Sequence, residues 1–164
     1  MRINGYLPLF VVMTLFALGA CIEPAEPPAA AYEPGVVTFD STLAAELRAD
    51  DYGMAQYVIA FLKTGPNTDQ DSLALAELQR AHLDNIRRLA EEGKLVLAGP
   101  FMDDGDLRGI YVFDVASVEE AEALTATDPA IQQGALEMEL HPWYGSAAVR
   151  RINDIHIRIS RANP

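Results

Sequence analysis

The sequence is poor in cysteine and lysine, and each shortage excludes a class of structure or partner. Cys21 is the only cysteine among 164 residues, so no disulfide can form within the chain. Lys63 and Lys94 are the only lysines, and 24 acidic side chains outnumber 12 basic ones, for a formal net charge of −12. Phosphate backbones and anionic membrane surfaces attract clustered Lys and Arg, so we expect no nucleic-acid partner and no polybasic membrane patch.

The chain also lacks an apolar run long enough to span a bilayer comfortably, which takes about 20 residues. The run Leu7–Leu18 follows Arg2 and has the length of a signal-peptide core. Leu18-Gly19-Ala20-Cys21 then resembles a bacterial lipobox, in which the cysteine is lipidated and becomes the new N-terminus. We therefore expect residues 1–20 to be a lipoprotein signal peptide. A short uncleaved anchor and an ordinary signal peptide are the alternatives.

Lipidation of Cys21 would anchor the protein to a bacterial membrane in an extracytoplasmic space. Ile22, rather than an aspartate, follows the cysteine, which favours the outer membrane if the cell has two. Residues 21–52 are then predicted to be a tether and an N-terminal extension. The segment IEPAEPPAAAYEPG cannot bury a core and is expected to be extended. Asp40 or Ser41 is suited to cap a short helix after it.

The folded domain is expected over residues 53–145, where strand and helix patterns alternate. The apolar run Tyr57–Leu62 predicts a first strand, and an apolar stripe spaced three and four apart predicts a helix over 72–92, ended by Gly93. Further elements are predicted as strands over 94–102, 109–115 and 136–143, a helix from Ser117 to Ala126, and a helical turn begun by Asp128-Pro129.

This βαββαβ order is that of the ferredoxin-like α+β fold, with a four-stranded antiparallel sheet. Strands one and three are then central, and both are apolar on each face. Pro100 falls on an edge strand, where its missing N–H is tolerated, or marks a bulge. Helices cover only one face of such a sheet, so we expect the second face to pack against another copy of the chain, in a homodimer.

Residues 146–164 are predicted to be a C-terminal extension. Ile155, Ile157 and Ile159 alternate with polar residues, which favours a fifth, one-faced strand. Such a strand could pair with Val36–Phe39 or extend the dimer interface. Four arginines make the tail locally basic, so a solvated edge strand with some intersubunit ion pairs is the plainest interpretation.

Five motifs in order resemble the YCII-related family, over residues 56–145. One is the opening strand, and the others are Arg80-Ala81-His82-Leu83, Gly93-Lys94-Leu95 through Ala98-Gly99-Pro100-Phe101, Val115-Ala116-Ser117 and Asp128-Pro129-Ala130. The resemblance implies a dimeric α+β barrel with a catalytic histidine and aspartate. It also implies dechlorination or isomerisation of hydroxylated rings as one chemistry. The lipobox, the tether and the tail lie outside the pattern.

His82 and Asp128 are therefore the candidate catalytic residues. An imidazole on a Leu/Ile stripe needs partners for its nitrogens when buried. Asp128 would bond one nitrogen and fix the tautomer, which leaves the other nitrogen to act as general acid or base. The alternatives are a core histidine bonded to backbone carbonyls and an aspartate that only begins a helical turn. Both roles are compatible for Asp128, because a carboxylate has two oxygens.

Weaker candidates surround this pair. Gly99 and Pro100 are expected to shape a bulge that opens space beside the sheet, or to contact a ligand directly. His141, Trp143 and Tyr144 could line a pocket mouth, although packing alone would explain them. No metal site is expected, because the chain has no HxH or HExxH motif, and no cofactor is implied. The sequence thus favours an anchored acid/base enzyme for a small substrate, and the resemblance implies a cyclic one. The rival is a non-catalytic envelope lipoprotein that binds a ligand or a protein.

Overall fold

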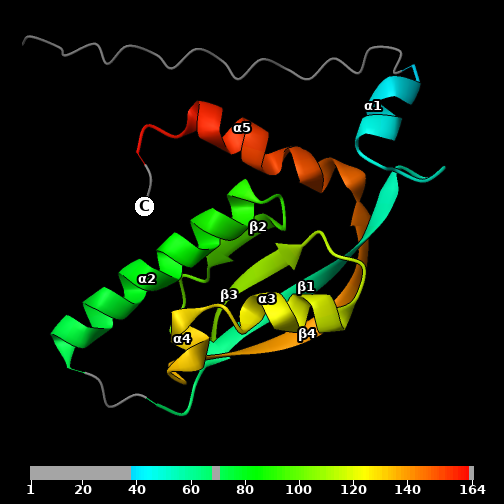
Figure 1. Cartoon of the computed structure of the whole chain (residues 1–164). Coiled ribbons are helices and arrows are strands. Elements are labelled where there is room, and N and C mark those ends of the chain that lie inside the picture. The colour runs from blue at the N-terminus through cyan, green and yellow to red at the C-terminus, as the bar shows by residue number, and fades with distance from the viewer. Residues whose placement is uncertain (1–37, 68–70, 163–164) are drawn as a thin grey trace, which may run out of the picture. The chain divides into compact units, whose positions relative to one another are not determined.

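The computed structural model describes residues 38–67 and 71–162 (Figure 1). The signal-peptide run, Cys21 and most of the predicted tether lie outside the described residues. From Phe39 onward the chain forms one unit. No helix within 38–67 or 71–162 is both long enough and apolar enough to cross a membrane.

The sheet has four antiparallel strands in the order β2-β3-β1-β4. The strands are β1 (Met54–Thr64), β2 (Leu95–Pro100), β3 (Leu107–Phe113) and β4 (Leu136–Ser146). Strands one and three are central, as predicted, and Pro100 ends an edge strand. The ferredoxin-like α+β fold is confirmed. The bulge expected at Gly99-Pro100 is wrong in position, because the register of β2 shifts between Leu95 and Leu97 instead.

The helices begin and end where local capping chemistry places them. In α2 (Ser72–Glu91) the Asp71 carboxylate accepts from the Leu73 and Ala74 amides, and Gly93 follows with φ +68°. Ser117 caps α3 (Val118–Thr125) and Asp128 caps α4 (Pro129–Gln132), as predicted. The short helix α1 (Ser41–Glu46) is capped by Asp40.

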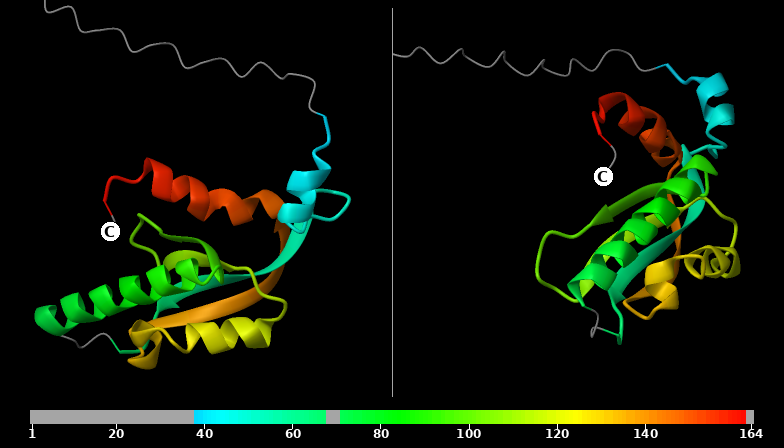
Figure 2. Two further views of the ribbon diagram at one scale, coloured as in Figure 1. Left: turned by 45° about the horizontal axis from the view of Figure 1, so that its top comes forward. Right: turned by 60° about the vertical axis from the view of Figure 1, so that its left-hand side comes forward.

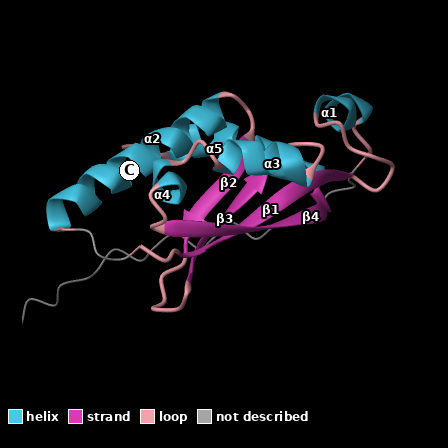
Figure 3. Cartoon of the chain, turned by 60° about the horizontal axis from the view of Figure 1, so that its bottom comes forward, coloured by secondary structure: helices cyan, strands magenta, loops and turns pink. Residues whose placement is uncertain are grey.

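One face of the sheet is covered by α2 and α3, as Figure 3 shows. Leu89 of α2 and Ala121 of α3 are buried against the even-numbered side chains of β1, with Tyr111 and Phe113 of β3. Burial of apolar area, at about 25 cal/mol per Å², is the main force that holds these layers together. The layer between α2 and the sheet is where the candidate site lies.

The second face is partly covered from within the chain. Leu47 after α1 and Ala147 of the 3-10 helix η1 (Ala147–Arg151) pack with Tyr57 and Val112 in a second, smaller core. Arg150 fixes this arrangement: it binds both oxygens of Asp114, at 2.6 and 2.8 Å, and its guanidinium stacks over Tyr57. Burial would raise the pKa of Asp114, but the hydrogen bonds and charges of Arg150 and Arg48 outweigh it and hold that pKa below its usual value.

The fifth strand predicted in the tail is wrong. Residues Ile152–Ile159 form helix α5, which lies beside β2 (Figure 2) and bonds it through Asn153 Nδ2 to the Leu95 carbonyl, at 2.8 Å. Ile152, Ile155 and Ile159 are spaced three and four apart, so the same isoleucines also satisfy a helical stripe. The alternation of the isoleucines, which predicted a strand, is a weaker indicator here than their helical spacing. Ile155, Ile157 and Ile159 remain exposed.

Candidate functional site

His82 and Asp128 meet in the buried layer between α2 and the sheet. His82 lies on the inner face of α2, and its Nδ1 is 2.8 Å from Asp128 Oδ2. Only 10% of the His82 side chain and none of the Asp128 side chain is exposed. The structure thus joins two residues 46 positions apart that the sequence marked as candidates. Their catalytic role stays a prediction.

Asp128 uses both of its oxygens. Oδ1 accepts from the Ala130 amide at 2.9 Å, which is the cap of α4, while Oδ2 lies on His82. Pro129 follows at the first helical position, where its missing N–H costs nothing. A carboxylate only accepts hydrogen bonds, so this contact fits an Nδ1–H donor, which in a neutral imidazole leaves the lone pair on Nε2.

Tyr111 is the third member of the group, and sequence reasoning missed it. Its hydroxyl lies 3.3 Å from His82 Nε2, and the two rings stack with centroids 6.3 Å apart. Burial, and then the negative charge of Asp128, raise the pKa of Tyr111 well above its usual value. Tyr111 therefore keeps its proton and donates to Nε2. Asp128, His82 and Tyr111 form one hydrogen-bonded line from α4 through α2 to β3.

A second cluster of polar side chains, made of Asn85, Arg88 and Thr127, connects α2 to the start of α4. Asn85, one turn after His82, is buried, and its Oδ1 lies 2.8 Å from Arg88 Nη2 and 3.0 Å from Thr127 Oγ1. Thr127 immediately precedes Asp128, so this cluster fixes the approach of α4 to α2. Asn85 Nδ2 is buried without a partner among the described residues.

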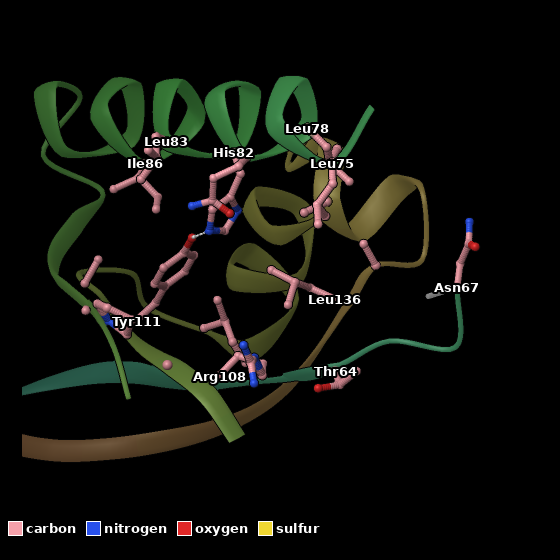
Figure 4. Close-up of a pocket in the computed structure, with 18 residues that line it drawn as sticks. Thr64, Asn67, Leu75, Leu78, His82, Leu83, Ile86, Arg108, Tyr111 and Leu136 are labelled. Atoms are coloured by element: carbon pink, nitrogen blue, oxygen red, sulfur yellow. Dashed lines mark hydrogen bonds between the residues drawn. The ribbon is translucent and has the colours of Figure 1, made fainter. Parts of the chain in front are cut away.

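His82 and Tyr111 line a cavity of about 790 Å³, shown in Figure 4, and Asp128 lies buried behind His82. His82 projects into it from α2 and Tyr111 from β3, and their side chains meet on its wall. The rest of the lining is mainly apolar, with Leu62, Leu75, Leu78, Leu83, Ile86 and Leu136 among its members. The volume suits a compact organic ligand, and the apolar wall would exclude water from the imidazole.

Gly99 and Pro100 also line this cavity, on the β2 side. Gly99 lies opposite Ile110 and Pro100 opposite Gly109 in regular register, so β2 itself has no bulge at these two residues. A Cβ on Gly109 would lie 2.6 Å from the Gly99 carbonyl oxygen, so the two strands approach closely at this point. The edge of the cavity depends on this contact.

His141, Trp143 and Tyr144 do not line the cavity. His141 projects from the other face of the sheet, beside Glu139 at 2.8 Å, and Trp143 packs on Tyr57 with centroids 5.6 Å apart. Tyr144 bonds Asp50 and borders a separate shallow depression beside Arg150. Strand parity separates His141 and Trp143 from His82, because the cavity lies on the helix-covered face and these two residues point away from it. Cys21 lies outside the described residues.

Within residues 38–67 and 71–162, no group of three or more His, Cys, Asp or Glu side chains is placed to hold a metal ion. The groups that the site does offer are the Tyr111 hydroxyl, the His82 imidazole and the buried Asp128 carboxylate. That set supports proton transfer at Nε2, with Asp128 fixing the ring and balancing the charge of an imidazolium.

Comparisons with known proteins identify the family of this chain. The family model for the YCII-related domain matches residues 55–144. The uncharacterized protein YjpA of Bacillus subtilis (strain 168) is 34% identical over 62 residues, which are 38% of this chain and 71% of that protein. Among solved structures, a 5-chloro-2-hydroxyhydroquinone dehydrochlorinase, TftG from Burkholderia phenoliruptrix AC1100 in complex with 2,5-dihydroxybenzoquinone, is similar. It is 21% identical, with a TM-score of 0.41, and the match covers 54% of this chain and 93% of that one. The family match spans more than half of the chain, which therefore belongs to the YCII-related domain family.

Proposed function

We propose that this protein is an acid/base enzyme that moves a proton on a small organic substrate, with His82 as the base. The observation that carries the proposal is the Asp128–His82–Tyr111 line on the wall of an apolar cavity. A histidine that serves only in core packing would not be expected to have a ligand-sized cavity next to its Nε2 atom.

In the proposed step, the Tyr111 hydroxyl turns from Nε2 and the substrate presents an acidic C–H or O–H in its place. The proton passes to Nε2, and the electron pair stays on the substrate. Asp128 Oδ2 stabilises the resulting imidazolium, which then returns the proton to another atom of the substrate or to a leaving group. A positioned general base contributes about 10²–10⁴-fold in rate. Neutral Tyr111 is placed to donate to an oxygen that gains charge.

The proposed assembly is a homodimer. Ile59, Phe61 and Ile110 are only half buried on the face that η1 leaves open, and Lys63 and Glu139 form an ion pair beside them. A second copy would cover this apolar strip. Membrane anchoring through Cys21 belongs to the same proposal and rests on the lipobox-like residues Leu18-Gly19-Ala20-Cys21.

Hydrogen–deuterium exchange tests the proposed chemistry without a known substrate. Hydroxylated aromatic rings and cyclic ketones would be incubated with the protein in D₂O, and the loss of C–H signals followed by NMR. The protein should accelerate exchange of at least one compound, and His82→Asn should abolish this while its circular dichroism is unchanged. Equal exchange in both proteins for every compound would contradict the proposal.

A binding role without turnover is the second candidate. Helix α5 lies beyond the family match and exposes Ile155, Ile157 and Ile159, which a metabolic enzyme has no evident need to display. The same exchange experiment separates the two roles. Ligand binding in the cavity without exchange, in wild type and His82→Asn alike, would favour the binding role.

A further inference from the structure

Arg108 holds an unusual position in β3. Leu62 of β1 pairs with Gly109 and Lys63 pairs with Leu107, so Arg108 is the extra residue of a β-bulge. In a regular strand its side chain would share the face of Ile110, away from the helices. The bulge turns it to the other side, where it lines the cavity with Tyr111 and Gly109. Figure 4 shows Arg108 on the strand side of the cavity, across from His82 on α2.

The charge of Arg108 is not used within the described structure. Arg48 and Arg150 bind Asp114, Arg88 binds Glu92, and Arg151 binds Glu46. Arg108 has no ion pair and no side-chain hydrogen bond to any residue of 38–67 or 71–162. Among the described residues that line the cavity, Arg108 is the one arginine or lysine.

The cavity wall offers this guanidinium no internal counter-charge. None of the described lining residues is acidic, and the nearest carboxylate of the site, Asp128, is engaged by His82 and the Ala130 amide. Thr64, Asn67 and Gln79 supply the neutral polar groups of the lining. The cavity therefore combines one cation, a mainly apolar wall and a proton acceptor.

We propose that Arg108 binds an anionic oxygen group of the substrate, so the substrate class is a compact organic monoanion such as a ring carboxylate. This inference rests on the proposed function for its second half, that the proton removed lies near His82. A guanidinium pairs with a planar carboxylate through two parallel N–H···O bonds, which fixes orientation as well as position. The anion would hold one end of the substrate at β3 while its apolar body reaches α2.

A matched pair of probes tests the anion site. 4-Hydroxybenzoate and 4-hydroxybenzamide share shape and ring but differ by one charge, and their binding would be followed by NMR shifts of the labelled protein. We expect wild type to bind the benzoate about tenfold more tightly than the amide, the effect of one charge-assisted pair. Arg108→Gln should remove the preference, and Arg108→Lys should keep part of it.

Arg80→Gln is the control, because Arg80 lies on the exposed side of α2 and has no described ion-pair partner. It should leave the preference unchanged. Equal affinities for the two probes in wild type, no binding of either at millimolar concentration, or a preference that survives Arg108→Gln would overturn the anion site. The preference should also persist in His82→Asn. Loss of exchange activity alone therefore bears on the proposed function and not on Arg108.

Discussion

Asp128 accepts from His82 Nδ1 at 2.8 Å through one oxygen and from the Ala130 amide at 2.9 Å through the other. The residue that begins α4 is thus also the residue that orients the imidazole of α2. A change in the position of α4 would move the carboxylate and with it the ring. The ordinary folding role of an aspartate before a proline and the proposed catalytic role are therefore served by the same carboxylate.

Tyr111→Phe should change the alkaline limb of the stability curve. Burial raises the pKa of Tyr111 in the folded state, so the Tyr111 hydroxyl loses its proton at a lower pH in the unfolded chain than in the folded one. Each pH unit above about 10 then lowers the free energy of unfolding by up to about 1.4 kcal/mol. Below that range the group contributes no pH dependence. Urea unfolding at pH 8 and pH 11 should show a smaller loss in Tyr111→Phe than in wild type. An equal loss would mean that Tyr111 ionises freely in the folded state.

Arg150→Ala should destabilise the protein by about 3 kcal/mol, because it leaves the Asp114 carboxylate half-buried without its bidentate partner. It also removes the contact over the Tyr57 ring. Arg151→Ala, which breaks an exposed pair with Glu46, is the control and should cost less than about 1 kcal/mol. Thermal or urea unfolding measures both. Similar costs for the two variants would show that Arg150 does not fasten the C-terminal extension.

Gly109→Ala should destabilise the sheet by about 1–3 kcal/mol, because its new methyl group would lie 2.6 Å from the Gly99 carbonyl oxygen. Gly99→Ala, one strand away, is the matched control: no atom lies within 4 Å of a Cβ built there, so its cost should be small. The free energy of unfolding of both variants gives the comparison. Equal costs would contradict the close approach of β2 and β3 beside the cavity.

The sheet face that the helices leave open predicts a homodimer, and a charged residue introduced on this face should dissociate it. Phe61→Glu places a carboxylate on the half-buried apolar strip next to Glu139, and we expect wild type to sediment as a dimer and this variant as a monomer. Leu73→Glu, at an exposed position of α2, should remain dimeric. Analytical ultracentrifugation at micromolar concentration decides. A monomeric wild type would refute the homodimer.

The fold and half of the site could be read from the sequence because their signals are local. Asp71, Gly93, Ser117 and Asp128 mark helix ends by their own side-chain or backbone chemistry. His82 stood out as a polar residue on an apolar stripe. The alternation along β4 places His141 and Leu140 on different faces of the sheet, so the sequence already indicates that His141 lies away from the cavity.

Two residues of the site could not be read in this way. Tyr111 lies in a strand that is apolar on both faces. A tyrosine in such a strand is expected to pack in the core, and nothing in the pattern indicates that its hydroxyl contacts a histidine. Arg108 enters the cavity only through a bulge, and a bulge is set by the pairing of β3 with β1 rather than by alternation. In the tail, the isoleucines fit both a period of two and a period near 3.6, so the sequence alone does not separate strand from helix. In the structure the segment is a helix, and Asn153 bonds it to Leu95 of β2.

The tautomer of His82 tests the central claim most directly. Long-range ¹⁵N–¹H NMR of the ring distinguishes a proton on Nδ1 from one on Nε2. The account predicts that neutral His82 carries its proton on Nδ1, bonded to Asp128, and that Asp128→Asn shifts the proton to Nε2 because an amide can donate to Nδ1. A wild-type ring protonated on Nε2 would leave no lone pair facing the cavity and would contradict the proposed base. A ring unaffected by Asp128→Asn would contradict the claim that Asp128 sets the tautomer.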